Sequence, residues 1–317
     1  MKTAEPTYRD GGVGDLKRTF AVSERAVYHA AARQGLLPPG REPTDADIRS
    51  DWVRQRGLIE FLAAQADGQY CVCESDSELV GYARLVRFDG TEQLTELMVA
   101  PEHQGRGIGR ELLRRCFPDW PSEGRTRMVV AAGAPADLSL YTDFGVMPVA
   151  GHWHMRIETD RYLAARAADH EDSGAAAHVL EPDHAIAEWG RLEPAVLGRP
   201  RTPLHRYLAR DRTCLACIDS GTGEARGLCW VSGQGELGPA IGASAEDLVP
   251  VVLAALDRVA RTREPEHLSA FATTAAWPLL RRLRRFGFRV WWPSWIMSSQ
   301  PLPRLDCYGP TRPPHVL

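Results

Sequence analysis

The sequence predicts an α+β fold built as two similar halves. Two helical stretches open the chain, and three apolar, alternating segments follow them, as expected of an antiparallel meander. A glycine-rich loop then joins the last of these strands to an amphipathic helix. The same order of helices, strands and helix returns after residue 177. This return indicates an internal repeat on the scale of a whole domain.

The first half begins with two predicted helices, parted by the breaker sequence Leu-Pro-Pro-Gly at residues 37–40. Hydrophobic periodicity and turn residues then place the other elements. The expected elements are helices 13–33 and 45–66, strands 70–74, 78–86 and 93–99, a helix from residue 108, a strand 127–131, a helix 136–143 and a strand 146–157.

Residues 164–177 are rich in Ala, Asp, Glu and Gly and lack apolar periodicity, so we expect a linker there. The predicted domains are therefore residues 1–163 and 178–317. In the second domain the expected elements are helices 186–197 and 203–209, strands 213–219, 225–231 and 236–241, a helix 247–262, a strand 267–271, a helix 275–286 and a strand 289–298.

The loop at residues 99–109, Val-Ala-Pro-Glu-His-Gln-Gly-Arg-Gly-Ile-Gly, carries the clearest functional signal. Its glycines lie between a strand end and a helix start, where bare backbone can approach a ligand. The free amides of the first helical turn point at such a ligand. Side chains that add donors and positive charge are Gln104, Arg106 and Arg110. The loop is therefore predicted to hold a diphosphate.

Spacing distinguishes this loop from other phosphate loops. A dinucleotide-binding fold has Gly-x-Gly-x-x-Gly after its first strand, and a triphosphate loop needs Gly-Lys-Ser/Thr, which is absent. Here Gln-x-x-Gly-x-Gly follows an apolar strand that ends in Val-x-Pro. This pattern resembles the acyl-CoA loop of the GNAT superfamily of N-acyltransferases. The resemblance implies two GNAT-like domains, each with a mixed, mostly antiparallel sheet flanked by helices.

The resemblance also implies acetyl-CoA as co-substrate. The strand residues Met98 and Val99 would meet its pantetheine arm, and their amides could polarise the thioester carbonyl. The residues expected at its pyrophosphate are Gln104, Gly105, Arg106, Gly107, Ile108, Gly109 and Arg110. No such motif occurs after residue 200, so the second half resembles a degenerate domain that lacks the cofactor loop. We therefore expect one acyl-CoA site per chain.

Tyr141 is the candidate general acid. It lies in Leu-Tyr-x-x-x-Gly-Val, which is similar to the family's Leu-Tyr-x-x-x-Gly-Phe, whose Tyr hydroxyl faces the thioester sulfur. The family often has Asn seven residues and Ala four residues before this Tyr. Here Ala134 and Asp137 stand at those positions, so the usual side-chain amide bond to the CoA arm is missing.

Glu96 is the candidate base, because an attacking amine must lose a proton. It alternates with Leu97 along its strand and so shares a face with Met98. A carboxylate there could take a proton directly or through water. Glu92 and Gln93 are the alternatives.

The predicted function is an acetyl-CoA-dependent N-acetyltransferase that acts on a primary amine of a small molecule. A protein amine is the alternative acceptor, and a non-catalytic acyl-CoA-binding regulatory protein is the alternative class. We expect no metal, because His152 and His154 lack a third ligand.

Charge, apolar runs and cysteine count argue against nucleic-acid-binding, membrane and disulfide-bonded proteins. A net charge of −3 does not favour nucleic acid as a partner. The absence of an 18-residue apolar run and of an apolar leader predicts a cytoplasmic protein without membrane contact. Seven scattered cysteines, an odd number, suggest reduced thiols. The sequence leaves the oligomeric state open.

Overall fold

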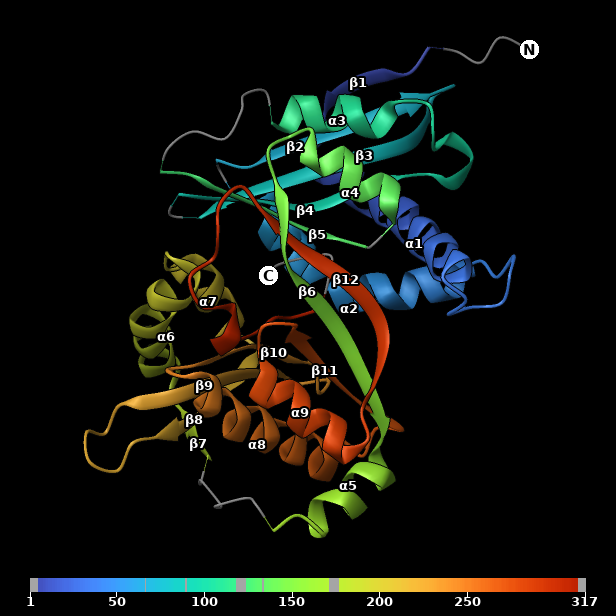
Figure 1. Cartoon of the computed structure of the whole chain (residues 1–317). Helices are drawn as coiled ribbons and strands as arrows, with labels where there is room; N and C mark the ends of the chain where they lie inside the picture. The colour runs from blue at the N-terminus through green and yellow to red at the C-terminus, as the bar shows by residue number, and fades with distance from the viewer. Residues whose placement is uncertain are drawn as a thin grey trace. The chain divides into compact units, whose positions relative to one another are not determined.

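The computed structural model describes residues 5–65, 67–88, 90–117, 124–132, 134–170 and 177–312. Contacts divide the chain into two compact units. The first comprises residues 1–129 and 139–146, and the second comprises residues 130–138 and 147–317. Figure 1 shows the helices and strands of both. Within the described ranges, no helix is long and apolar enough to span a membrane.

The first unit contains a mostly antiparallel sheet. Its strands, in the order in which they lie side by side, are β1 (Thr7–Asp10), β2 (Gln69–Ser75), β3 (Glu78–Phe88), β4 (Thr91–Val99) and β5 (Thr126–Ala131). Only β4 and β5 run parallel in this set. A tight turn joins β2 to β3, with left-handed backbone at Asp76 and Ser77. Short-chain polar residues such as these are suited to that conformation.

Helices cover both faces of this sheet, as Figure 1 shows. They are α1 (Leu16–Arg33), α2 (Asp45–Ala63), α3 (Ile108–Cys116) and the end of α4 (Pro135–Thr142), with short 3₁₀ turns at Val13–Asp15 and Pro101–His103. Side-chain alternation along β3 separates the two faces. Tyr82 packs with Val22 of α1, whereas Gly81 faces Ile108 and Leu112 of α3.

The second unit contains two sets of strands. The first set is ordered β13 (Tyr308–Gly309), β10 (Leu237–Gly242), β9 (Ala225–Ser232), β8 (Arg212–Ile218) and β7 (Ala177–Leu180), all antiparallel. In the second set, β6 (Met147–Glu158) lies between β12 (Arg289–Ser298) and β11 (His267–Thr273), again antiparallel.

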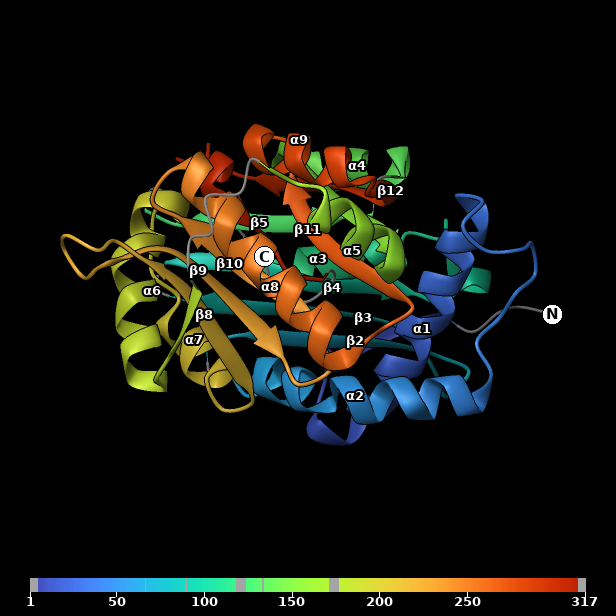
Figure 2. The same cartoon turned by 90° about the horizontal axis from the view of Figure 1, so that it is seen from below.

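The core of the second unit gathers around its longest helix. The helices are α5 (Thr159–Ala167), α6 (Pro182–Leu197), α7 (Thr202–Leu208), α8 (Ala245–Arg263) and α9 (Trp277–Phe286), with a 3₁₀ turn at Leu305–Cys307. Figure 2 shows α8 lying across β9 and β10. Its apolar face, including Leu248, Val251 and Leu256, is buried against residues of β8 to β11. This burial accounts for the helix despite Pro250, which lies in its first turns.

These findings confirm the predicted α+β class, with mostly antiparallel sheets flanked by helices. The short elements β1, β7 and β13 lacked a sequence signal. Of the expected linker 164–177, α5 takes the part up to Ala167, and residues 171–176 lie outside the described residues. The domain boundaries at residues 163 and 178 stay predictions, and β6, which they assign to the first domain, packs within the second unit.

Candidate functional site

The glycine-rich loop forms an open turn between β4 and α3. Gly105 and Gly107 have φ of +74° and +84°, a left-handed conformation that side chains other than glycine rarely adopt. Gly107 is the N-cap of α3. Ile108, the first residue of the helix, is buried in the core. Nothing lies within 4 Å of the points where Cβ atoms of Gly105 and Gly107 would stand. The turn therefore exposes the amide end of α3 without an obstructing side chain.

Polar side chains of the loop are held at its rim. Gln104 donates from Nε2 to the Val99 carbonyl oxygen at 3.0 Å, which ties the loop to the end of β4. Arg106 donates from Nη2 to the Glu102 carbonyl oxygen at 2.7 Å. Both side chains remain exposed. Their remaining donors can therefore turn toward an anion at the helix end.

Arg110 pairs with Asp143 at 2.8 Å, and the side chains are 47% and 51% exposed. An exposed pair of this kind contributes little stability. An incoming diphosphate could therefore draw the guanidinium away from its carboxylate at small cost.

Along one edge of β4, the pairing with β5 ends before the glycine-rich loop begins. The pairing of β4 with β5 runs from Thr91↔Thr126 to Leu94↔Val129, and no described register pair joins the two strands beyond it. On the other side, pairing with β3 continues to Val99↔Gly81. The stretch with Met98 and Val99 thus offers backbone groups to a ligand on the edge that β5 has left.

Tyr141 lies on the part of α4 that belongs to the first unit. The neighbouring Leu140 side chain comes within 3.8 Å of the Cβ position of Gly109. Asp143, the residue after the end of α4, pairs with Arg110 in the first turn of α3. Tyr141 is 8% exposed. The structure therefore brings the candidate acid and the glycine loop into one region of the same unit.

Glu96 lies on the α1 face of β4, inside a buried polar cluster. Its carboxylate accepts a hydrogen bond from the Tyr82 hydroxyl at 2.7 Å and pairs with Arg84. The Arg84 and Glu96 side chains are 1% and 2% exposed. Burial raises the pKa of Tyr82 well above its usual range, and the adjacent carboxylate acts in the same direction. Tyr82 therefore keeps its proton and donates a hydrogen bond to Glu96.

Glu92, the alternative base, is surrounded by cations. Arg87 lies 3.0 Å from its carboxylate, and Arg125 and Arg127 each lie 3.3 Å away. Burial alone would raise the pKa of Glu92, and the guanidinium groups outweigh this and lower it below its usual range. Sequence reasoning missed these arginines and Arg84, although a charged residue within a buried apolar strand signals a partner.

Comparison with known proteins shows what the fold of the chain is similar to. Residues 66–146 match the family model described as "Acetyltransferase (GNAT) domain", a range that contains β2 to β5 and the glycine loop. This part of the chain is similar to a GNAT acetyltransferase domain. The two units of the chain also match a solved structure, "Tandem GNAT protein from the clavulanic acid biosynthesis pathway (without AcCoA)". That match has 18% identity and a TM-score of 0.60, and covers 94% of this chain and 99% of that chain.

This chain resembles two named proteins in sequence. It is 29% identical over 189 residues to mycothiol acetyltransferase of Cellulomonas flavigena, which covers 59% of this chain and 51% of the relative. It is 28% identical over 137 residues to the L-amino acid N-acyltransferase MnaT of Escherichia coli, covering 41% of this chain and 74% of that protein. The chain thus spans about half the length of the mycothiol acetyltransferase.

Proposed function

We propose that this chain is an acetyl-CoA-dependent N-acetyltransferase that transfers the acetyl group to a primary amine of a small molecule. The observation that carries the proposal is the open glycine turn at the start of α3, next to the free edge of β4. The names of both relatives, an acetyltransferase and an N-acyltransferase of amino acids, agree with it.

The residues of the turn fit acetyl-CoA. Bare amides at the helix start suit its pyrophosphate, as do the exposed donors of Gln104, Arg106 and Arg110. The β4 edge at Met98 and Val99 suits an extended pantetheine arm with amide groups of its own. Acetyl-CoA supplies an acyl group already activated as a thioester. No covalent enzyme intermediate is needed for such a transfer.

Two side chains are assigned to proton movement. Tyr141 lies on the helix whose Leu140 reaches the loop and is the proposed general acid for the leaving group. Glu96 is the proposed proton acceptor for the amine. Because its carboxylate is buried and bonded to Arg84 and Tyr82, we assign the transfer to an intervening water. The two partners fix the orientation of the carboxylate.

The test is turnover with defined amines. Purified protein is incubated with acetyl-CoA and a panel of amino acids, amino sugars and polyamines, and released thiol is measured. Acetylation of a small amine supports the proposal. Turnover only with a lysine-containing peptide would assign a protein acceptor instead. Micromolar acetyl-CoA binding with no turnover on either panel would contradict an enzymatic role and favour a regulatory acyl-CoA-binding protein.

A further inference from the structure

The second unit repeats the strand-to-helix step of the first, but its helix start is closed. Ser244, the N-cap of α8, accepts from the Asp247 amide at 3.1 Å and donates to the Asp247 carboxylate at 2.7 Å. Arg226 pairs with the same carboxylate at 2.9 Å. In α8 the carboxylate of Asp247 bonds the N-cap side chain, whereas in α3 the carboxylate of the first turn, Glu111, accepts from Arg114 and Arg115 farther along the helix. A second anion at α8 would meet the charges of Glu246 and Asp247.

The strand before this helix is also closed. The last described strand of the chain, β13, pairs antiparallel with β10 through Ala240↔Gly309 and Ile241↔Tyr308. In the first unit the corresponding edge of β4, the strand before α3, has no described register pair with β5 beyond Leu94. The chain therefore covers with its own backbone the edge of β10 that corresponds to the proposed pantetheine edge.

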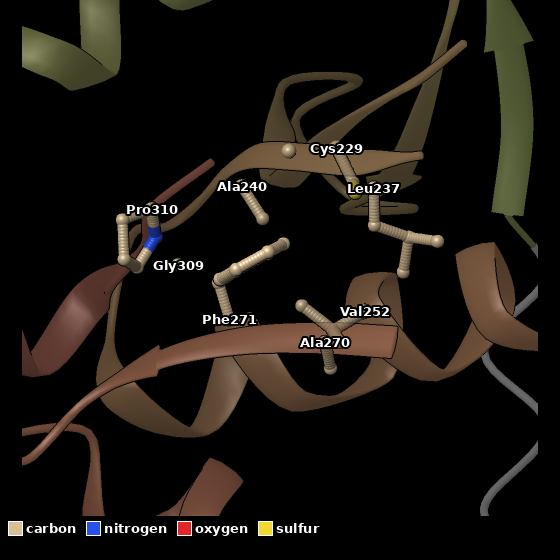
Figure 3. Close-up of a pocket in the computed structure, with 9 residues that line it drawn as sticks. Cys229, Leu237, Ala240, Val252, Ala270, Phe271, Gly309 and Pro310 are labelled. Carbon is tan, nitrogen blue, oxygen red and sulfur yellow. The ribbon is translucent and has the colours of Figure 1, made fainter. Parts of the chain in front are cut away.

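The segment with β13 is closely packed between β10 and β11. A Cβ atom at Gly309 would lie 3.2 Å from Ala240 Cβ and 3.6 Å from the Phe271 carbonyl oxygen. Figure 3 shows Gly309 and Pro310 beside Ala240 and Phe271. The space left among these residues is about 10 Å³, close to the volume that one water requires. With this segment in place, the cleft has no room for a pantetheine arm.

Three contacts with side chains outside residues 305–311 hold this segment. The buried Tyr308 hydroxyl accepts from Arg201 Nη2 at 2.8 Å, and Arg201 is itself paired with buried Glu193 at 2.7 Å. Thr273 donates to the Leu305 carbonyl oxygen at 2.6 Å. The His152 ring lies 3.1 Å from the Thr311 carbonyl oxygen. The segment is thus fixed before, at and after β13.

We propose that residues 305–311 are a built-in occupant of the second unit, seated on the backbone edge that would otherwise receive an acyl-pantetheine arm. This inference rests on the proposed function, because it takes the β4 edge as the acyl-CoA site. It assigns the second unit no acyl-CoA site of its own. It also gives the C-terminal segment a specific place, as an intramolecular β-strand ligand.

Calorimetry with acetyl-CoA distinguishes this inference from the proposed function. The wild-type chain is expected to bind one equivalent. Gly107→Glu, which adds bulk and negative charge to the first loop, is expected to bind none. Arg106→Glu, at an exposed position outside the helix, repeats the test if Gly107→Glu does not fold. Binding of one equivalent by a folded loop variant would overturn the inference. No binding by the wild type would overturn the proposed function itself.

Thiol labelling tests the seating of the segment. Cys307 is buried in the wild type, so N-ethylmaleimide should modify it slowly. Gly309→Val should clash with Ala240 and raise the labelling rate of Cys307 at least tenfold, as followed by mass mapping of the peptide. Gly233→Val is the matched control, because nothing lies within 4 Å of that Cβ position. An unchanged Cys307 rate in folded Gly309→Val would overturn the inference.

Amide hydrogen exchange gives a test on the wild-type protein alone. At least one of the amides of Tyr308 and Gly309 should exchange as slowly as those of β10, because the two strands form one antiparallel ladder in which alternate residues bond across it. Rapid exchange at both residues, with slow exchange in β10, would contradict a seated segment whether or not the variants fold.

Discussion

Arg84 and Glu96 form an ion pair that lies almost wholly out of solvent, on neighbouring strands of the first unit. Removing one partner of a buried pair leaves a charge without compensation. Arg84→Met should therefore lower the free energy of unfolding by about 3–5 kcal/mol, as measured by urea denaturation. The double variant Arg84→Met/Glu96→Leu should recover at least half of that loss. If the double variant loses as much stability as Arg84→Met and Glu96→Leu lose together when measured separately, the two side chains are not coupled.

Glu96→Gln tests the proposed proton acceptor. The amide can still accept a hydrogen bond from Tyr82 but cannot take up a proton. Turnover should fall about 100-fold, within the range expected for lost general base catalysis. Glu92→Gln is the matched comparison, because Glu92 is buried on the same strand and already bonded by arginines. Equal losses of turnover in the two variants would assign Glu96 a structural role only.

Tyr141→Phe tests the proposed acid. The ring is retained, so packing at this buried position is preserved, whereas the phenolic proton is lost. We expect turnover to fall about 100-fold while the acetyl-CoA dissociation constant stays within about twofold. Tyr28→Phe on α1 serves as the control and should leave turnover unchanged. Unchanged turnover in Tyr141→Phe would remove the assignment.

Gln104→Leu tests the link between the loop and β4. The variant loses the hydrogen bond to the Val99 carbonyl oxygen, which is worth about 1 kcal/mol. Acetyl-CoA affinity should therefore fall about fivefold by calorimetry. Gln234→Leu, an exposed position in the second unit, should have no effect. Equal affinities for wild type and Gln104→Leu would mean that this bond does not order the loop.

The buried His152 predicts how stability depends on pH. Burial lowers its pKa from 6.5 to about 4, so the folded protein favours the neutral ring. The neutral His152 ring therefore contributes fully to the free energy of unfolding above pH 6.5. This contribution, about 3 kcal/mol in total, is lost as the pH falls toward 4. His152→Gln should show a smaller decrease in the free energy of unfolding between pH 7 and pH 4. Parallel pH curves for the two proteins would contradict this.

The regular elements were predictable because their apolar residues repeat at helical or strand spacing. Thus a 3₁₀ turn begins at Val13, the residue where the sequence predicted a helix, and α1, which follows it from Leu16, ends at Arg33 as expected. The partner of Glu96 was not predictable. Counting back from the β3–β4 turn places Thr95 opposite Arg84, but an irregularity between Arg84 and Leu85 shifts the register, so Glu96 stands there instead.

Contacts between segments far apart in the chain could also not be predicted from the sequence. The pair Tyr308–Gly309 is too short to show a period, and its role depends on a neighbour far away in the chain. The loop at residues 99–109 was found because its function requires local features, namely glycines at a helix start. A local pattern can be read from one sequence, whereas a non-local pairing needs the folded chain.

The position of β6 affects how the protein is made. His154 of β6 contacts Ser269 of β11 at 3.0 Å, although 115 residues separate them in the chain. A ribosome therefore releases β6 well before the strands on either side of it exist. Until then both edges of β6 carry unpaired backbone N–H and C=O groups, which can pair with other nascent chains. An expression fragment that starts at residue 178 would lack the middle strand of this set and should be recovered as insoluble material.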